Sequence, residues 1–175
     1  LNRLTHYVES MSNLQRLEDI LPEMAAVDRT QLIESLRGLA ALLCQSSGRQ
    51  LEFQAELPEM EQLFLDKELV ANVAENLLNN AVRYAAQTVR FELSLKQLAD
   101  QPCFCMTVLD DGPGFSAEEL RLAAEPYYSG ADRAEHFGLG LYICTVLCRQ
   151  HGGSLQFANA EAGGGLVTAS FLLKH

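Results

Sequence analysis

The chain has 175 residues, 48% of them hydrophobic, which is enough for one domain with a substantial core and a short additional segment. Its 13 basic and 23 acidic residues give a formal net charge of −10, which argues against nonspecific binding to nucleic acid or to an anionic membrane. No apolar run approaches the roughly 20 residues of a membrane span, and the start does not resemble a signal peptide. An anionic ligand therefore needs local help from a metal ion or from individual arginines.

Cysteine usage favours a reducing compartment, because the five cysteines form an odd number without a disulfide framework. The spacing of Cys144, Cys148 and His151 would place them on one face of a helix, where a zinc site is conceivable. Cys103 and Cys105 would share one face of a strand. We favour buried free thiols, because the sequence contains no pair of CxxC motifs.

Residues 1–21 form a narrow apolar seam, typical of a coiled coil or a two-helix hairpin. Its members are Leu1, Leu4, Val8, Met11, Leu14, Leu17 and Leu21. Pro22 ends this segment. Because the chain begins with Leu1 and not with Met, we expect it to be part of a longer protein.

The next elements are an amphipathic helix and a strand. Asp28 is the expected N-cap of the helix, which ends near the "SSG" at 46–48. "LEFQAEL", residues 51–57, alternates apolar and polar side chains and predicts a half-buried strand.

A third helix should run from an Asp66 cap to about Ala86, and another should open near Gly138 and end before Gly152. Four further strands are expected at "VRFEL", "CFCMTVLD", "SLQFAN" and "GLVTASFLL". The order lacks the regular strand-helix-strand rhythm of a parallel doubly wound sheet. We therefore predict an α/β fold, a two-layer α/β sandwich with a mixed five-stranded sheet and three main helices, preceded by an N-terminal helix.

The third helix is rich in asparagine, although each Asn costs roughly 0.6 kcal/mol of helix stability relative to Ala. Four fall within nine residues, at Asn72, Asn76, Asn79 and Asn80. Asn72, Asn76, Asn80 and Arg83 lie on one polar side at spacings of four, four and three, with Tyr84 beside them. Amide oxygens can ligate Mg²⁺, which takes its other ligands from water and phosphates. The alternative is an ordinary solvated helix face.

The stretch "LDDGPGF", residues 109–115, follows a predicted strand directly. Gly112 and Gly114 allow a sharp turn and close approach to a ligand, and an Asp at a strand end can accept a hydrogen bond from a ligand amino group. An ordinary turn is an open alternative. The stretch also fits a GxGxxA dinucleotide fingerprint ending at Ala117, but Pro113 removes a backbone N–H that such a loop needs.

The stretch "FGLGLYIC", residues 137–144, places Gly138 and Gly140 at the start of a helix. Free N–H groups and the helix dipole attract phosphate there. A tight loop-to-helix turn is the alternative. The GxxxxGK[ST] loop of P-loop nucleotide sites is absent.

Together these three stretches make residues 28–175 resemble the ATP-binding catalytic domain of bacterial sensor histidine kinases, within the Bergerat-type ATPase superfamily. "ENLLNNAVRYA" is similar to the family's asparagine box, "DDGPGF" to its first glycine box, "AAEPYYSG" to a degraded phenylalanine box, and "FGLGL" to its second glycine box. "GGGLVTASFLL" resembles its closing strand. Residues 1–22 then resemble the second helix of the dimerisation hairpin and a linker.

The resemblance implies ATP and Mg²⁺ as cofactors and assigns roles to the matching residues. Asn80 would coordinate Mg²⁺ with support from Asn76, Arg83 would reach a phosphate, and Tyr84 would flank the nucleotide. Asp110 would bind the adenine amino group. The remaining nucleotide-binding positions are Gly112, Gly114, Gly138, Leu139, Gly140, Leu141 and, through water, Thr168.

The resemblance also implies a mobile lid at residues 115–137 over ATP. Two positions depart from the family pattern there: Ala124 stands where a phenylalanine is usual, and His136 where a glycine is common. These departures put lid packing and ATP affinity in question.

By the same resemblance, the chain transfers the γ-phosphoryl group to a histidine on a hairpin that lies N-terminal to it. The family's acceptor is a histidine followed by an acidic residue on the first helix of the hairpin. None of the four histidines of this chain fits that pattern; they are His6, His136, His151 and His175. The implied partners are the parent's own hairpin, a cognate response regulator and a second copy in a homodimer, with no nucleic acid. The implied location is the cytoplasmic part of a membrane-anchored sensor.

Three rival functions stay open. An ATP-hydrolysing relative of the gyrase kind would place a water-activating Glu at Asn76, and Asn cannot act as a general base. Glu75 is adjacent, but one residue along a helix turns it about 100° away. The second rival is a nucleotide-binding domain without turnover, and the third is a serine kinase of the anti-sigma type.

Overall fold

The computed structural model describes residues 19–122 and 139–173. The predicted N-terminal helix, most of the predicted lid with Ala124 and His136, and Gly138 lie outside these ranges. Every structural statement below concerns the described part of the chain.

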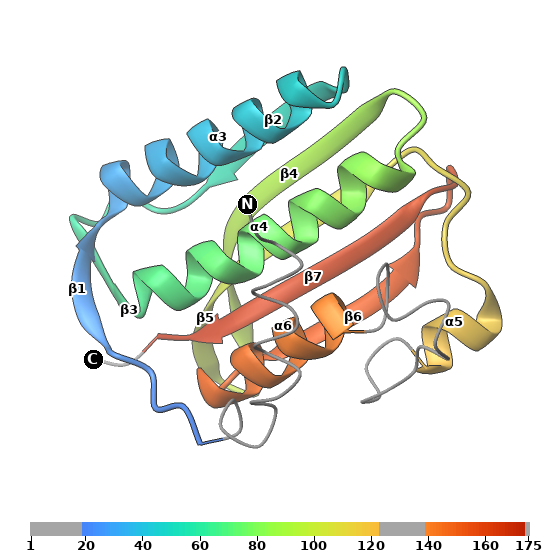
Figure 1. The fold of residues 1–175 in the computed structure, drawn as a ribbon. Helices are drawn as coiled ribbons and strands as arrows, with labels where there is room; N and C mark the ends of the chain where they lie inside the picture. The colour runs from blue at the N-terminus through green and yellow to red at the C-terminus, as the bar shows by residue number, and fades with distance from the viewer. Residues whose placement is uncertain (1–18, 123–138, 174–175) are drawn as a thin grey trace.

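A mixed five-stranded sheet forms one layer of the domain (Figure 1). Only β2 and β4 run parallel, whereas the other three neighbouring pairs are antiparallel. This confirms the predicted mixed sheet. The strands, in sheet order, are β2 (Gln50–Glu56), β4 (Thr88–Leu98), β5 (Gln101–Asp110), β7 (Gly165–Leu172) and β6 (Ser154–Asn159).

Three helices cover one face of this sheet, as Figure 1 shows, and complete the predicted two-layer sandwich. They are α3 (Arg29–Ser46), α4 (Lys67–Tyr84) and α6 (Leu139–Gln150). A short helix, α5 (Ala117–Leu122), follows β5 and lies beyond the end of the sheet. None of the described helices is both long and apolar enough to cross a membrane.

The structure adds a small antiparallel sheet of β1 (Ala25–Asp28) and β3 (Gln62–Leu65), which was not predicted. Each strand has four residues, too few for a period-two pattern to be distinguished from a loop. β1 ends at Asp28, the N-cap of α3, and β3 ends directly before Asp66, the N-cap of α4, so the two strands fix where these helices begin. Asp28 accepts a hydrogen bond from the Gln31 N–H at 2.8 Å, as expected of an N-cap.

The core lies between the helices and the sheet. The buried side of α4 has apolar residues at helical spacing, which pack on β5 and on the neighbouring helices. Burying each large side chain there contributes roughly 1.5–3 kcal/mol. The buried residues of α4 are Leu69, Val70, Val73, Ala74, Leu77, Leu78, Ala81 and Val82. The asparagines of α4 lie outside this buried set.

Asp66 connects three segments of the chain at the N-terminus of α4. Its carboxylate accepts hydrogen bonds from the Glu68 and Leu69 N–H groups at 3.1 and 3.0 Å, which confirms the predicted N-cap. Its other oxygen accepts from the Glu23 N–H at 2.8 Å, and its backbone N–H donates to His151 Nε2 at 3.0 Å. His151 is buried, so its observed contact is with the fold and not with a ligand.

All five cysteines are buried thiols, in agreement with the favoured interpretation. Burial raises the pKa of Cys105 to about 11 and that of Cys144 to about 12. Protonated, buried thiols are poor nucleophiles and poor metal ligands.

Candidate functional site

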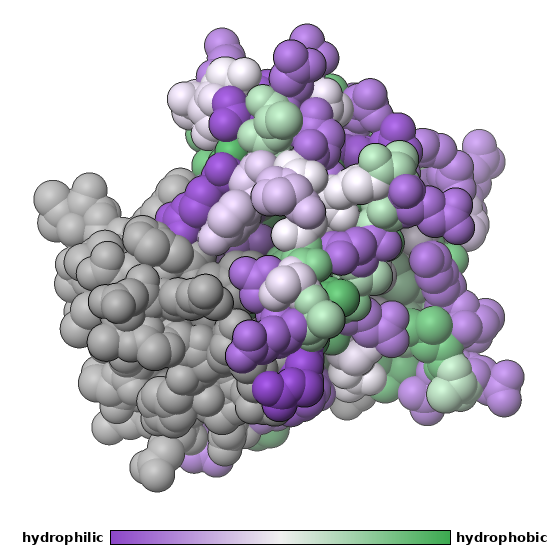
Figure 2. Space-filling view, turned by 90° about the vertical axis from the view of Figure 1, so that its right-hand side faces the viewer, coloured by the Kyte–Doolittle hydropathy of each residue, from purple (hydrophilic) through white to green (hydrophobic). Residues whose placement is uncertain are grey.

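The C-terminal end of α4 and the loop after β5 enclose a cavity of about 110 Å³. It brings together four residues that the sequence assigned to nucleotide binding from separate motifs, Asn80, Tyr84, Asp110 and Gly114. Pro113, Phe115, Glu119 and Gly165 complete the lining. Typical ligand pockets measure about 300–1,000 Å³, so this cavity matches one end of a nucleotide and not the whole molecule. Figure 2 shows the side of the molecule that lies at the right of Figure 1, and the coloured residues on it are mostly hydrophilic with small hydrophobic areas.

Asp110, the last residue of β5, is a buried carboxylate that is 6% exposed. Its Oδ1 accepts hydrogen bonds from the Gly112 N–H at 2.8 Å and the Gly165 N–H at 3.4 Å. Burial raises its pKa, and these two backbone hydrogen bonds oppose the shift. Within the described residues its Oδ2 makes no hydrogen bond, so one acceptor of a fixed carboxyl remains for a ligand donor.

Asp111 has a different role, although it is the next residue. Its exposed carboxylate accepts hydrogen bonds from the Gln87 and Thr88 N–H groups, each at 3.0 Å. The hydrogen bond from Gln87 is the main cause of its lowered pKa. Asp111 thus fastens the turn between α4 and β4 and takes no part in lining the cavity.

Two glycines permit the close packing around Asp110. A Cβ on Gly112 would lie 2.1 Å from the Tyr84 carbonyl oxygen, so only glycine lets the loop cross the end of α4. A Cβ on Gly165 would lie 2.9 Å from Asp110 Oδ2 and 3.0 Å from Phe115 Cε2. Sequence reasoning missed Gly165, although the run of three glycines at 163–165 signals close backbone approach.

The asparagines of α4 lie in different surroundings and do not form a single site. Asn80 lines the cavity beside Asp110, and Asn76 lies one turn before it with its Nδ2 donating to the Asn72 carbonyl oxygen at 2.9 Å. Asn72 lines a different cavity, near the N-terminal half of α4. Arg83 is exposed on the last turn of α4 and does not line the smaller cavity.

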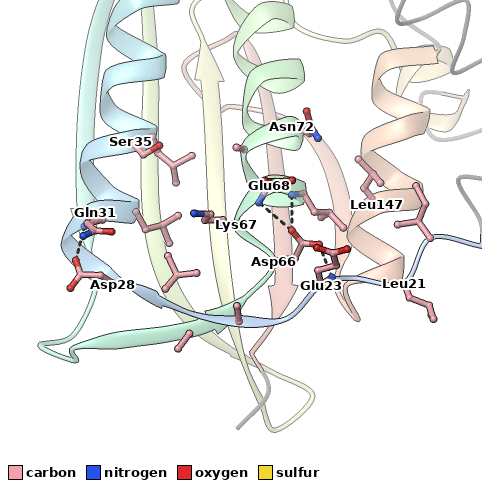
Figure 3. Close-up of a pocket in the computed structure, with 18 residues that line it drawn as sticks. Leu21, Glu23, Asp28, Gln31, Ser35, Asp66, Lys67, Glu68, Asn72 and Leu147 are labelled. Carbon is pink, nitrogen blue, oxygen red and sulfur yellow. Dashed lines mark hydrogen bonds between the residues drawn. The ribbon is translucent and has the colours of Figure 1, made fainter.

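That second cavity, of about 800 Å³, lies between the N-terminal halves of α3 and α4 (Figure 3). Two of its acidic side chains are already used inside the fold, since Asp28 and Asp66 cap the two helices. Leu147 of α6 closes one side. None of the residues predicted to bind nucleotide lines this cavity, so the smaller one is the better candidate despite its size.

Helix α6 begins at Leu139, consistent with the predicted helix start. Leu141 is 2% exposed and its side chain belongs to the core, so any contact it makes with a phosphate must come from its backbone. Gly140 is partly exposed. The first residues of an α-helix have free N–H groups, which are suited to phosphate.

The position of Thr168 contradicts its predicted contact with the adenine end. Thr168 pairs with Thr107 across β7 and β5, with their Oγ1 atoms 3.4 Å apart. Side chains alternate along a strand, so Thr107 and Asp110 lie on opposite faces of β5. Thr168 therefore points away from the helices and the cavity. Gly165, near the start of the same strand, is the residue that meets Asp110.

The oxygen atoms of the side chains around the cavity can supply only part of the ligands that Mg²⁺ needs. Among the described residues, no group of three or more His, Cys, Asp or Glu side chains could hold a metal ion. The Asn80 amide faces a cavity that also contains a carboxylate, and Mg²⁺ commonly uses one or two protein oxygens together with substrate phosphates. The site thus fits a metal that arrives with a nucleotide better than a metal held by the protein alone.

Comparison with known proteins shows the family to which the chain belongs. The family model described as histidine kinase-, DNA gyrase B- and HSP90-like ATPase matches residues 65–175, and the chain belongs to this family. The sensor protein kinase PilS of Pseudomonas aeruginosa strain PAO1 is 32% identical over 113 residues, covering 63% of this chain and 21% of PilS.

Two further proteins are similar over nearly the whole chain. The signal transduction histidine-protein kinase BaeS of Escherichia coli K12 is 28% identical, covering 98% of this chain and 37% of BaeS. The structure of full-length ShkA in complex with AMPPNP shares the fold with a TM-score of 0.79 at 20% identity, covering 98% of this chain and 36% of ShkA. The chain thus spans 21–37% of the length of the two curated relatives.

Proposed function

We propose that this chain is the ATP-binding catalytic domain of a sensor histidine kinase. The observation that carries the proposal is the cavity in which the fixed carboxylate of Asp110 lies beside Asn80 of α4. The family assignment and the sensor kinases among the relatives support it. AMPPNP in the similar ShkA structure supports a nucleotide as the ligand.

In this proposal each residue contributes binding or orientation. Asp110 Oδ2 accepts a hydrogen bond from the adenine amino group, and Asn80, supported by Asn76, would offer its amide oxygen to Mg²⁺. When bound, Mg²⁺ supplies neutralisation of the triphosphate charge. Arg83 reaches a phosphate, Tyr84 flanks the nucleotide, and the backbone from Gly138 to Leu141 receives phosphate oxygens. Phosphoryl transfer depends mainly on such positioning and charge stabilisation.

Hydrolysis is disfavoured by the side chains on α4. A hydrolysing relative needs a general base where Asn76 lies, and an amide cannot accept the proton of water. Steady-state phosphate release should therefore stay far below the typical enzyme turnover of about 10 per second. Release near that rate would favour the ATPase alternative.

The partners follow from the same proposal. The phosphoryl acceptor is a histidine on the dimerisation hairpin of the parent protein, and residues 1–22 are the end of that hairpin. A homodimer in the full-length protein, a cognate response regulator and a cytoplasmic position below a membrane anchor complete the arrangement.

The proposal is tested by transfer in trans. The chain, γ-labelled ATP and the separately produced hairpin of its parent should give acid-labile label on the hairpin and none on the chain itself. Asn80→Ala should abolish transfer, whereas Arg83→Ala should reduce it less. Acid-stable label on serine or threonine would instead identify the serine-kinase alternative, and nucleotide binding without any transfer would identify a domain without turnover.

A further inference from the structure

A side-chain clamp connects the edge strand β6 to the wall of the nucleotide cavity. Asn159, the last residue of β6, accepts a hydrogen bond from the Phe115 N–H through Oδ1 and donates through Nδ2 to the Phe115 carbonyl oxygen, each at 2.7 Å. One amide therefore satisfies both backbone groups of a single residue 44 positions away.

Phe115 is a residue whose position affects the cavity. It lines the cavity directly, is 9% exposed, and packs edge-on against Phe157 at 6.1 Å between ring centroids. It directly follows Gly114 in the loop after Asp110 and precedes Ser116. Ser116 and Glu119 form a reciprocal capping box at the start of α5, with hydrogen bonds of 2.7 and 3.1 Å.

The pairing of β6 with β7 also positions the other side of the cavity, which Asp110 and Gly165 form. Asn159 pairs with Gly165 across β6 and β7, and Gly165 donates to Asp110. The loop approaches Asn159 closely, because a Cβ on Gly114, whose φ is +76°, would lie 2.7 Å from Asn159 Oδ1. Asn159 on β6 thus sets the distance between Phe115 on one side of the cavity and Asp110 with Gly165 on the other.

We propose that Asn159 is a positioning residue for nucleotide binding, which holds Phe115 and the loop after Asp110 where the adenine end of the ligand fits. The inference rests on the proposed function and adds a residue that does not itself line the cavity but contacts residues that do. Asn159 is exposed, yet both its Oδ1 and its Nδ2 bond to the backbone of the buried residue Phe115. Its side chain therefore positions Phe115 more than it hydrates the surface.

The test compares two substitutions at Asn159 with a matched control on the same strand. Asn159→Ala removes both hydrogen bonds and should weaken binding of a fluorescent ATP analogue by about tenfold. Gln156→Ala, at an exposed position of β6, should leave the affinity unchanged. Affinities are measured well below the unfolding temperature of each variant, so that lost stability does not appear as lost binding.

Asn159→Asp supplies a readout that a general loss of packing would not produce. An ionised carboxylate can accept from the Phe115 N–H but repels its carbonyl oxygen, whereas a protonated carboxyl can accept and donate like the native amide. The ratio of variant to wild-type dissociation constants should therefore fall toward one as the pH decreases from 8 toward the carboxyl pKa of about 4. Asp110 and Glu119, the other acidic residues that line the cavity, are present in both proteins, so their contributions cancel in the ratio.

The outcomes separate the two proposals. A wild-type chain that does not bind the ATP analogue would overturn the proposed function itself. Wild-type binding together with unchanged affinity in Asn159→Ala would overturn only the role of Asn159. A ratio for Asn159→Asp that does not change with pH would also overturn it, because the two hydrogen bonds would then not control binding.

Discussion

Asp110 and Asp111 are adjacent in sequence, yet their carboxylates hold different parts of the molecule. Asp110 Oδ1 accepts from the Gly112 N–H at 2.8 Å at the edge of the cavity, whereas Asp111 Oδ1 accepts from the Gln87 N–H at 3.0 Å outside it. Successive side chains at the end of a strand point to opposite sides, so a single step along the chain separates a ligand group from a structural one.

This pair gives the first prediction. Asp110→Asn replaces one acceptor oxygen with a donor and should weaken binding of a fluorescent ATP analogue by about 1–3 kcal/mol, the scale of a hydrogen bond to a charged group. Asp111→Asn is the matched control and should change the affinity little, while lowering the midpoint of denaturant unfolding. Equal affinities of the wild type and Asp110→Asn would contradict the assignment of Asp110 to adenine.

The second prediction concerns pH and follows from the raised pKa of Asp110. The folded chain keeps this proton to a higher pH than the unfolded chain, so the carboxyl contributes most to stability below its ordinary pKa of 3.8. That contribution is lost as the pH rises through the folded-state pKa. The free energy of unfolding of the wild type, minus that of Asp110→Asn, should therefore decrease between pH 4 and 7.

Urea unfolding of the two proteins at several pH values measures this difference. Subtracting the variant removes the other titrating groups, including Asp111, whose lowered pKa acts in the opposite direction. A difference that increases with pH would show that hydrogen bonds to Asp110 outweigh its burial.

The third prediction separates the two ends of the asparagine-rich helix. Asn80→Ala should weaken Mg-ATP binding by about 10- to 100-fold, the scale on which the loss of metal-site support lowers affinity. Asn72→Ala should not weaken it, because Asn72 lines the other cavity. Both changes raise helix propensity by roughly 0.6 kcal/mol, so helix destabilisation cannot explain a difference between them. Calorimetric titration with and without Mg²⁺ measures it, and equal losses in both variants would refute the assignment.

The fourth prediction compares two glycines. Gly165→Ala places a Cβ against Asp110 Oδ2 and the Phe115 ring, and should cost about 1–3 kcal/mol of stability as well as lowering nucleotide affinity. Gly38→Ala, in the exposed interior of α3, meets no atom within 4 Å and should stabilise the domain by about 0.5–1 kcal/mol. Denaturant unfolding of both variants tests the two signs together. A Gly165→Ala variant with native stability and affinity would show that the close approach is not required.

Much of the fold could be predicted because the long helices and strands carry clear local signals, namely capping residues and a regular spacing of apolar side chains. The caps at Asp28 and Asp66 and the apolar spacing along α4 predicted two helices with nearly their observed ends. The strands β1 and β3 were missed because four residues with one or two buried side chains produce no readable period. Their pairing depends on where the rest of the chain places them.

The sequence by itself determined which residue types are available near a ligand: the amides of α4, the acidic pair after β5 and the glycines around them. Only the tertiary structure decided which of them meet. Strand register turned Thr168 away from the cavity and brought Gly165 to Asp110, and it placed Asn159 beside Phe115. These contacts join residues at least 44 positions apart, and no local propensity specifies them, because they are set by packing between strands and loops.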